Sequence, residues 1–538
     1  MAETIGTDVL VIGGGAAAAR AGLEASSLGV RVTLVDKGKL GNSGSSPRCL
    51  LGIGAPLTLE DSPDAFYEDW VRVGCGISDQ PLIWECASGA AANIHQLLES
   101  SLDFARERGG KYYLYRGAGH SRPRNLTIKY KLPGTNLMTV FGNKMKRRGA
   151  RILEGVLITK LLRTEGRVNG AVGISPRGEV TIFRAKAVVL ACGGANRIFP
   201  CTPGWIRDET YRTTGDAFAL AFHAGAPVID LEFPNFRESP PGATRAGGKY
   251  FNARGERFME RYDPIALEKA PRQLTVSAVY TELKEGRGPI TWHVDKELLE
   301  RDPSMSARFG QRRKIKLGIE FQRLLGGVRI NKRGETDIPH LYSAGESAGG
   351  VHGADRMQGN AFLETQIFGA RAGYHAAKLA LRTGDADIDM RQVEEETARI
   401  KGINGDIRPS HITKEIQNMM WGEVGIIRSA DSLLKATAVI SRLKREQIPK
   451  LSGKKLFSAV ECMNMLLTAE MIIHAALKRE ESRGSHRRKD FPGQNDTDWQ
   501  KHIAIRSVDG KIAMTTIPVG QRGGRSDYCL TSPCCLRE

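Results

Sequence analysis

Glycines near the start of the chain have the spacing of a dinucleotide-binding turn. In VLVIGGGAAAARAGLEASSLGVRVTLVDKG, which begins at Val9, the residues Gly13, Gly15 and Ala18 occupy the three small-residue positions of G-x-G-x-x-G/A, and Gly14 lies between the first two. The first glycine allows a tight turn, the second lets the backbone approach a pyrophosphate, and the alanine lets a helix lie close to the strand. The N–H groups at the start of that helix are suited to bind phosphate.

A carboxylate follows at the end of the next apolar run, VRVTLVD. Asp36 ends this run and is placed to accept hydrogen bonds from a ribose. Strand, glycines, helix, second strand and terminal acid therefore occur in the order of a nucleotide-binding βαβ unit. A glycine-rich turn that holds no ligand is the alternative.

The elements that would position this site recur further along the chain. Strand-like runs between 150 and 195 end in ACGG, and the small-residue pattern of the first segment returns after 338. We therefore expect an α/β protein whose nucleotide-binding domain is interrupted by a more polar insertion. The expected segments are 1–237 and 339–387 for the Rossmann-like domain, 238–338 for the insertion, 388–510 for a helical domain and 511–538 for a tail, with roughly the last fifty residues irregular.

Composition places the chain among globular proteins. It has 538 residues, of which 41% are hydrophobic and 26% charged, enough for a large core and several domains. It contains no apolar run of about 18 residues, the length that a membrane span needs. The chain also enters its first strand without a basic segment and apolar stretch of the kind that directs export, so we expect a cytoplasmic protein without a membrane span.

The nine cysteines are scattered and form no C-x-x-C pair. This pattern predicts neither a disulfide framework nor a zinc or iron–sulfur site within the chain, so no metal ligand is expected. Near the C-terminus, the cluster CLTSPCC is either a solvated tail or a redox or partner contact.

The formal net charge of +18 indicates an acidic partner, an anionic substrate or an anionic surface. Nucleic acid is the obvious candidate for such a partner. However, the basic residues are dispersed, without interleaved aromatic residues or a known nucleic-acid module. We therefore expect no nucleic-acid binding.

Six motifs in one order resemble a known family. They are GGGAAAARAG, ACGGANRIF, TTGDAFALAFHAGAPVIDLEF, NARGERFMERYDP, LYSAGESAGGVHGADRMQGNAFLE and ESRGSHRRKDFPGQNDTDWQKH. This order is similar to that in the flavoprotein subunits of succinate dehydrogenase and fumarate reductase, in L-aspartate oxidase and, more distantly, in the adenylylsulfate reductase α subunit. The resemblance spans nearly the whole chain. It implies FAD as the dinucleotide, an α+β capping domain as the insertion and a C-terminal helical domain.

The resemblance also implies which residues contact FAD. The glycine motif with Asp36 and Lys37 matches the pyrophosphate and ribose contacts, and Leu157 stands where the backbone meets the adenine. The loop GNSGSSPRCLLGIG matches the segment that wraps the isoalloxazine. Further matching positions in the family's motifs are Ser43, Gly44, Ser45, Gly52, Asp216, Glu346, Ala361 and Phe362.

One position bears on how the flavin is attached. Membrane-bound members of the family join FAD covalently to a histidine in the wrapping loop, and Ser45 stands at the matching position here. The resemblance therefore implies a non-covalent FAD.

The implied substrate site departs from the family pattern. Where the family has a histidine in QFHPT, FPNFRES places Arg237, and where it has a histidine before MGG, FQRLLGG places Gln322. RQLTVSAV places Ser277 at the proton-donating arginine of RDVVSR, and Arg356 of GADR keeps the arginine of GANR. Because serine cannot replace a guanidinium as a proton donor, we expect little succinate or fumarate turnover.

Four residues are candidates for catalysis. Arg356 either clamps a carboxylate or pairs with a structural acid, and Arg237 either binds substrate or faces solvent. His352 lies near the flavin by resemblance and either moves a proton or bonds to the backbone. Asp355, where the family usually has asparagine, either offsets the charge of Arg356 or acts as a base.

Three functions are therefore open. The first is an FAD-dependent oxidoreductase that exchanges electrons between a small anionic substrate and an iron–sulfur, ferredoxin-like partner subunit in a hetero-oligomer. FAD suits this task because it accepts two electrons together and releases them singly. The second is a subunit that relays electrons or has a structural role, with a disabled substrate pocket. The third is a solitary enzyme like L-aspartate oxidase.

Overall fold

The computed structural model describes residues 2–42, 44–48, 52–107, 109–129, 133–200, 213–240, 248–294, 297, 310 and 312–522. Its largest sheet has the strand order β5-β2-β1-β8-β7-β6, with β15 paired to β8. The strands are β1 Glu3–Ile12, β2 Val32–Asp36, β5 Arg151–Glu154, β6 Leu157–Thr164, β7 Arg167–Ile174, β8 Val180–Leu190 and β15 Leu341–Ser343. Strands β5, β2, β1, β8 and β15 run parallel, as in a Rossmann-like fold.

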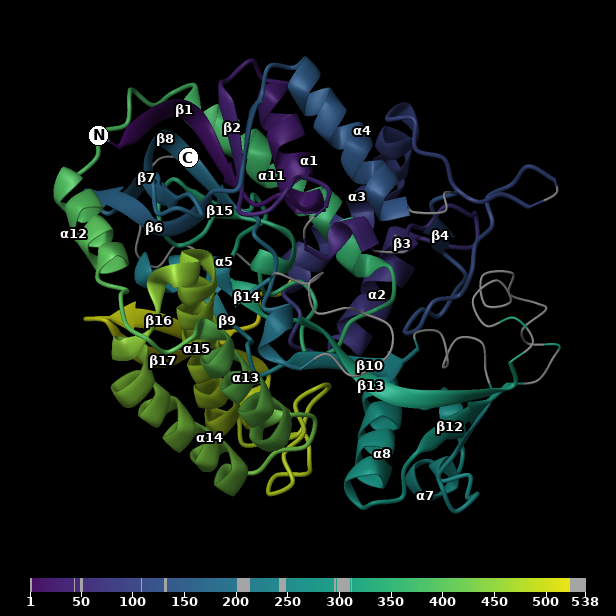
Figure 1. Cartoon of the computed structure of the whole chain (residues 1–538). Coiled ribbons are helices and arrows are strands. Elements are labelled where there is room, and N and C mark those ends of the chain that lie inside the picture. The colour runs from purple at the N-terminus through teal and green to yellow at the C-terminus, as the bar shows by residue number, and fades with distance from the viewer. Residues whose placement is uncertain are drawn as a thin grey trace.

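Helices cover this sheet and bring the two parts of the nucleotide-binding domain together (Figure 1). Helix α1, Ala16–Ser26, packs along α11, Asn360–Ala380, although they are far apart in the sequence. Small residues make the approach close, since a Cβ at Gly373 would lie 2.2 Å from the carbonyl oxygen of Ala21. The other helices of this region are α2 Pro63–Val73, α3 Gln80–Glu99, α4 Pro133–Arg147 and α5 Asp216–His223, and strands β3 Gly52–Gly54 and β4 Asn125–Thr127 pair beside them.

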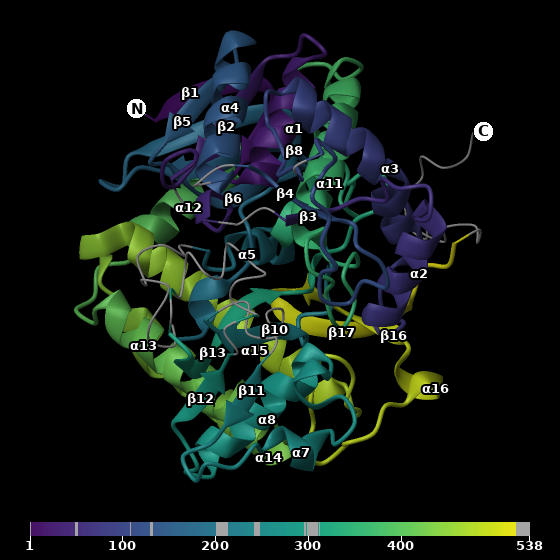
Figure 2. The same cartoon turned by 90° about the vertical axis from the view of Figure 1, so that its right-hand side faces the viewer.

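The insertion is an antiparallel sheet covered by helices, in agreement with an α+β capping domain (Figure 2). Its order is β10-β13-β12-β11, with β10 Pro234–Ser239, β13 Lys314–Leu324, β12 Ile290–His293 and β11 Lys249–Phe251. Helices α7, Met259–Tyr262, and α8, Arg272–Lys284, pack on the face that carries Tyr250, Trp292 and Ile315. Strand β10 crosses the boundary that we expect near residue 237.

The C-terminal region is mainly helical up to residue 478, and a short helix follows at 496–499. It contains α12 Met390–Lys401, α13 Pro409–Met419, α14 Ala430–Arg442, α15 Leu456–Lys478 and α16 Asp496–Trp499. Among the described residues one helical stretch, Gly453–Lys478, is long and apolar enough to cross a membrane, but 61% of its most apolar window is buried inside the protein. Such burial is typical of a core helix.

The expectation of an irregular end is wrong for residues 501–518. These residues form a hairpin of β16, Lys501–Val508, and β17, Lys511–Pro518, which joins β9 Val228–Ile229 and β14 Gly327–Val328 in a sheet of order β14-β9-β16-β17. The turn residues Asp509 and Gly510 both have positive φ, as Asp-Gly hairpin turns require. The alternating pattern HIAIRSV-DG-KIAMTTI carried this signal.

Candidate functional site

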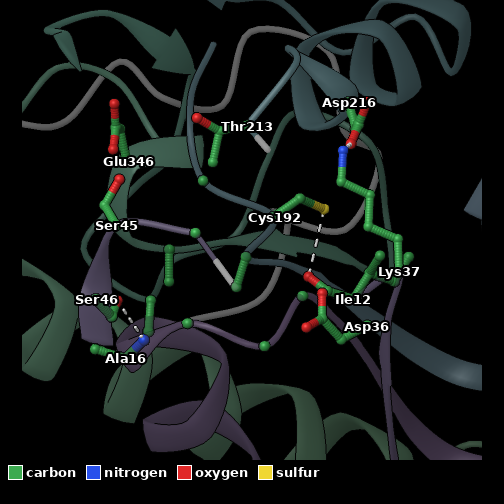
Figure 3. A pocket seen from close by; sticks show the side chains of 18 of the residues that line it. Ile12, Ala16, Asp36, Lys37, Ser45, Ser46, Cys192, Thr213, Asp216 and Glu346 are labelled. Atoms are coloured by element: carbon green, nitrogen blue, oxygen red, sulfur yellow. Dashed lines mark hydrogen bonds and ion pairs between the residues drawn. The ribbon is translucent and has the colours of Figure 1, made fainter. Parts of the chain in front are cut away.

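A cavity lies at the carboxyl ends of β1 and β2, where α1 begins (Figure 3), and its empty space, with the open solvent at its mouth, is about 1150 Å³. Its wall includes Gly13, Gly14 and Gly15 of the fingerprint. Gly13 has φ +124°, and a Cβ on it would lie 2.2 Å from the carbonyl oxygen of Ala191. Because a side chain there would collide with the backbone, the turn requires glycine at this position.

The neighbouring residues complete a phosphate-binding turn. A Cβ on Gly14 would lie 2.3 Å from Oδ2 of Asp36, and Gly15 is the N-cap of α1. The backbone N–H of Ala16 donates to Oγ of Ser46 at 2.9 Å. Ala18 is buried and does not line the cavity, so its small side chain acts in packing. Gly15, Ala16 and Ala17 line the cavity at the first turn of α1, the end of a helix that is suited to bind a pyrophosphate.

One end of the cavity carries a buried charge network (Figure 3). Asp36, Lys37 and Asp216 lie at this end, and Leu157 also lines the cavity. The Lys37 ammonium lies 2.7 Å from carboxylate oxygens of both Asp216 and Glu461. Burial opposes its charge, but the two carboxylates outweigh burial and raise the Lys37 pKa. Lys37 is thus held by protein carboxylates, while Asp36 stands at the end of β2 as the fingerprint predicts.

The other end carries Ser45 and Glu346 (Figure 3), and Gly44, Ala361 and Phe362 also line the cavity. Ser45 accepts a hydrogen bond of 3.1 Å from the side-chain amide of Asn196. Oε1 of Glu346 is buried without a hydrogen-bond partner among the described residues. Burial raises the pKa of this carboxyl group to about 7. An orphaned buried carboxyl group at a cavity wall is suited to bond a polar ligand.

Two predicted contacts differ from this set. Gly52 is the first residue of β3 and is absent from the cavity wall. Ser43 lies outside the described residues. With phosphate-binding N–H groups, a carboxylate for the ribose and a largely apolar wall, the cavity fits FAD.

Arg356 is a buried cation at the junction with the capping domain. Its Nη2 donates to Oε1 of Gln322 at 3.0 Å and its Nη1 to the carbonyl oxygen of Met357 at 3.0 Å, while its Nε has no partner. No carboxylate of the described residues lies within ion-pair distance. Burial, together with the nearby charges of Arg272 and Arg323, lowers the Arg356 pKa to about 9. Among the described residues the guanidinium therefore has no carboxylate in ion-pair contact, and a bound substrate could supply one.

Arg272 is the arginine that the sequence interpretation missed. It is the first residue of α8, and its Nη1 lies 3.3 Å from Oδ1 of Asn235 and 3.4 Å from Oε1 of Gln322. Its Nη2 donates to the carbonyl oxygen of Arg356 at 3.0 Å. Two arginines thus meet at Gln322. The signal was present, because RQLTVSAV and RDVVSR both begin with arginine.

Ser277 does not occupy this place. Its hydroxyl donates to the carbonyl oxygen of Gln273 at 2.7 Å within α8, more than one helical turn beyond Arg272. The interpretation of Ser277 as the replaced proton donor is therefore wrong, because the helix start, and not its middle, faces the arginine pair. The expectation of little succinate or fumarate turnover rested on Ser277 as the replaced proton donor, so it loses this reason.

Arg237 is paired with protein. It projects from β10 and forms a short ion pair with Glu320 of β13, directly opposite it in the register. The hydroxyl of Ser239 donates to the same carboxylate at 3.0 Å. The charge of Arg237 is therefore balanced before any ligand binds.

His352 and Asp355 have structural partners. Nε2 of His352 lies 2.8 Å from Oε2 of Glu364, its ring stacks on Trp70, and burial lowers its pKa to about 4. His352 is absent from the cavity wall. Oδ1 of Asp355 accepts bonds from the Asn235 and Gln273 amides at 3.1 and 3.0 Å. It contacts the backbone N–H of Arg356 at 2.7 Å instead of the guanidinium.

Arg323 is a second residue that sequence reasoning did not single out. It lines the cavity, is buried, and lies 3.6 Å from Oε2 of Glu364. Arg323 follows Gln322 in β13. Gln322 contacts Arg356 and Arg272, and the next side chain, Arg323, lines the cavity. Among the described residues, no group of three or more His, Cys, Asp or Glu side chains could hold a metal ion.

Comparisons with known proteins agree with this geometry. The FAD-binding-domain family matches residues 8–362, and the C-terminal family of fumarate reductase flavoproteins matches residues 413–523. The chain is 36% identical to one of the subunits of the fumarate reductase (CoM/CoB) of Methanothermobacter marburgensis, over 93% of this chain and 96% of that protein. It is 29% identical to an L-aspartate oxidase of Streptomyces coelicolor, over 95% and 93% of the two chains.

A solved structure shows the same fold. Mycobacterium smegmatis Sdh1 matches with a TM-score of 0.84 and 28% identity, over 97% of this chain and 96% of that chain. The matched families cover both the cavity and the C-terminal helices. The chain therefore belongs to the family of FAD-dependent oxidoreductases that contains the flavoprotein subunits of succinate dehydrogenase and fumarate reductase.

Proposed function

We propose that this protein exchanges a hydride with a small carboxylate-bearing substrate that Arg356 binds beside the flavin. The observation that carries this proposal is the buried Arg356 guanidinium, which has an unpartnered Nε and no carboxylate of the described residues at ion-pair distance. A buried cation is costly unless an anion pairs with it. A substrate carboxylate would supply that anion through charge-assisted hydrogen bonds.

Arg356 and Arg272 would have different roles in the reaction. When FAD is bound, it supplies the hydride chemistry. Arg356 orients the carboxylate, and Arg272 stands next to it as the proton donor or acceptor for the adjacent carbon, in place of Ser277. Gln322 accepts from both guanidinium groups and holds them side by side. Positioning of this kind is worth several orders of magnitude in rate.

Arg237 and Gln322, which replace the two histidines of the family, bear on which carboxylates the site would accept. Arg237 is neutralised by Glu320, and Gln322 is already bonded to arginines, so neither offers the free imidazole that the family has at these positions. We therefore keep the proposal of a changed specificity within the carboxylate class. We expect fumarate and succinate to bind, with turnover below that of family members that retain both histidines.

We propose that the flavin is non-covalent, because Ser45 cannot form the histidyl link, and that an iron–sulfur subunit exchanges electrons with it in a hetero-oligomer. The partner proposal is supported by the net charge of +18, by the absence of a C-x-x-C motif in the sequence and by a 36% identical relative that is itself one subunit of a larger enzyme. Retention of the arginine pair speaks against a protein that only relays electrons.

Calorimetric titration of the oxidised holoenzyme tests the anion site. Succinate, fumarate and the diamide succinamide are titrated into wild type and Arg356→Gln, with the exposed Arg333→Gln as the matched control. We expect the two acids to bind wild type and Arg333→Gln with equal affinity. Arg356→Gln should bind them at least about tenfold more weakly, in line with a lost charged hydrogen bond. Succinamide should not bind. Equal affinity in wild type and Arg356→Gln would refute the proposal.

A further inference from the structure

Arg323 is a buried cation at the wall of the FAD cavity. It is the last residue but one of β13, is only 7% exposed and lines the cavity. Among the described residues its guanidinium donates one hydrogen bond, from Nε to the carbonyl oxygen of Leu324 at 3.3 Å. Its Nη2 lies 3.6 Å from Oε2 of Glu364, which is longer than a hydrogen bond. Both terminal nitrogens therefore keep N–H donors that no described residue uses.

Arg323 lies at the end of the cavity that suits the isoalloxazine. Asp36 marks the end for the adenosine ribose, so the flavin ring of a bound FAD would reach the opposite end, which carries Glu346 (Figure 3). Burial raises the Glu346 pKa and the charge of Arg323 opposes this rise, which places the guanidinium near Glu346. The guanidinium also lies beside Glu364 of α11, and Phe362 of the same helix turn lines the cavity.

The local shape of β13 separates Arg323 from the arginine pair. Gln322 is the unpaired residue of a bulge, since Phe321 and Arg323 pair with consecutive residues of β10. A bulge changes the direction of a side chain. Gln322 contacts Arg356 and Arg272, and among the described residues these three are absent from the cavity wall that includes Arg323. Arg323 is therefore placed toward the flavin, while Gln322 serves the proposed substrate site.

The ionisable groups around Arg323 leave an excess of positive charge. Burial opposes the charge of Glu364, but His352 and Arg323 outweigh burial and lower the Glu364 pKa, so this carboxyl group is ionised. Burial lowers the His352 pKa to about 4, so its ring is neutral near pH 7. Burial and nearby arginines lower the Arg356 pKa to about 9, which leaves Arg356 a cation at neutral pH. Two cations thus stand against one fully ionised carboxylate, because the Glu346 pKa is about 7.

A cation at this end acts on the two redox states of a flavin differently. Two-electron reduction adds two electrons and one proton to the neutral isoalloxazine and leaves the ring with one negative charge near neutral pH. A positive charge beside the ring therefore favours the reduced form. Charge near the flavin ring is one of the means by which a protein tunes its redox behaviour.

We propose that the Arg323 guanidinium contacts the isoalloxazine of bound FAD and stabilises the anionic reduced flavin by its charge, while Glu364 limits this effect. The proposal concerns the cofactor and goes beyond the proposed function, because it needs no particular substrate. Its consequence is that Arg323 sets part of the driving force for hydride transfer between flavin and substrate in either direction.

Equilibrium reduction of the substrate-free holoenzyme tests this role. Xanthine and xanthine oxidase, with methyl viologen as mediator, reduce the flavin slowly and anaerobically together with a dye of known potential. Absorbance then gives the ratio of reduced to oxidised flavin at equal solution potential. The variants are Arg323→Gln, Glu364→Gln and the double variant. Arg333→Gln, at an exposed arginine, is the matched control with the same charge change as Arg323→Gln.

We expect Arg323→Gln to lower the ratio of reduced to oxidised flavin at least about tenfold, which is a midpoint potential lower by about 30 mV for a two-electron couple. Glu364→Gln should raise the ratio at least about threefold, because it removes the carboxylate that limits the Arg323 charge. The double variant should lie between the two single variants, and Arg333→Gln should stay within about twofold of wild type because solvent and salt screen its charge. Opposite shifts at two neighbouring side chains are the signature of charge, since a purely structural role would not reverse the sign.

An unchanged ratio in Arg323→Gln, or shifts of the same sign in Arg323→Gln and Glu364→Gln, would overturn the proposal. If Arg323→Gln does not retain FAD, the other variants decide. Arg323→Lys keeps the charge and should stay within about threefold of wild type, and Glu364→Gln should still raise the ratio. A ratio that is unchanged or lowered in Glu364→Gln would then overturn the proposal.

The succinate titration of Arg356→Gln separates this proposal from the proposed function, because the flavin ratios are measured without substrate. If the ratios shift as expected while Arg356→Gln binds succinate as wild type does, the proposed function fails alone. If succinate binding falls in Arg356→Gln while the ratios do not shift, the role of Arg323 fails alone.

Discussion

Arg272 donates a hydrogen bond of 3.0 Å from Nη2 to the backbone carbonyl oxygen of Arg356. This bond fixes the start of helix α8, in the capping domain, to the loop that carries Arg356. The two arginines would therefore move together if the capping domain moved. In the proposed function, this bond keeps the Arg272 side chain beside a substrate that binds at Arg356.

Replacement of Arg272 should affect the chemical step. We expect Arg272→Gln to lower kcat by about 10² to 10⁴ with little change in KM, as for the loss of a general acid. Arg272→Lys should recover part of the rate and alter the pH profile. Ser277→Ala is the matched control and should stay within about twofold of wild type, because its hydroxyl bonds only within α8. A larger loss in Ser277→Ala than in Arg272→Gln would restore the serine interpretation.

Asp36 should contribute to cofactor affinity. We expect Asp36→Ala to weaken FAD binding by about 1 to 3 kcal/mol, because a charged acceptor for the ribose hydroxyls is lost. Titration of apoprotein with FAD, followed by flavin fluorescence, measures the change. The exposed Asp406→Ala should leave the FAD Kd unaltered. An unchanged Kd in Asp36→Ala would mean that the ribose lies elsewhere in the cavity.

The flavin should leave the protein on denaturation. Ser45 lines the cavity, and the sequence resemblance matches it to the histidine that carries the flavin in covalent family members; serine forms no such link. After precipitation with trichloroacetic acid, we expect the yellow colour in the supernatant. Flavin that stays with the washed precipitate through denaturing electrophoresis would contradict this expectation.

His502 should make stability depend on pH above neutrality. Its Nδ1 lies 2.7 Å from Asp230 and its Nε2 3.4 Å from Asp79. Burial opposes its charge, but the two carboxylates outweigh burial and raise the His502 pKa to about 10. Since the folded pKa lies above the unfolded value of about 6.5, the stabilisation is complete below pH 6.5 and is lost as pH rises toward 10.

Urea unfolding of wild type and His502→Gln at several pH values measures this effect. The difference in free energy of unfolding should shrink by a few kcal/mol between about pH 6.5 and 10. His411→Gln, an exposed histidine, should give a constant difference. A difference between wild type and His502→Gln that does not change over this window would show that His502 is uncharged in the folded protein.

The parts of the site that could be predicted depend on local sequence. The turn at Gly13 needs a glycine because the backbone of Ala191 approaches it. The pattern of strand, glycine turn and helix predicts such a turn from neighbouring residues alone. The hairpin of β16 and β17 could also have been predicted from its Asp-Gly turn. Its membership in a sheet with β9 depends on contacts with residues more than 270 positions away.

The roles of charged residues were harder to predict. The charge of Arg237 is balanced by Glu320, because β10 and β13 pair in a register that places this carboxylate opposite it, although it is 83 positions away. His352 has Glu364 as its partner because the loop folds back on the start of α11. Since a pairing partner decides whether a cation is free, the sequence alone could not separate Arg356 from Arg237.

Single-turnover reoxidation of the reduced flavin tests the central claim most directly. Anaerobically reduced holoenzyme is mixed with unsaturated carboxylic acids, fumarate among them, and flavin absorbance is followed for wild type, Arg356→Gln and Arg333→Gln. The account predicts that at least one acid reoxidises wild type and Arg333→Gln alike, and that Arg356→Gln reacts with the same acid at least about 100-fold more slowly, as for a lost charge-stabilising donor. Reoxidation of Arg356→Gln at the wild-type rate, or of wild type by none of the acids, would contradict it.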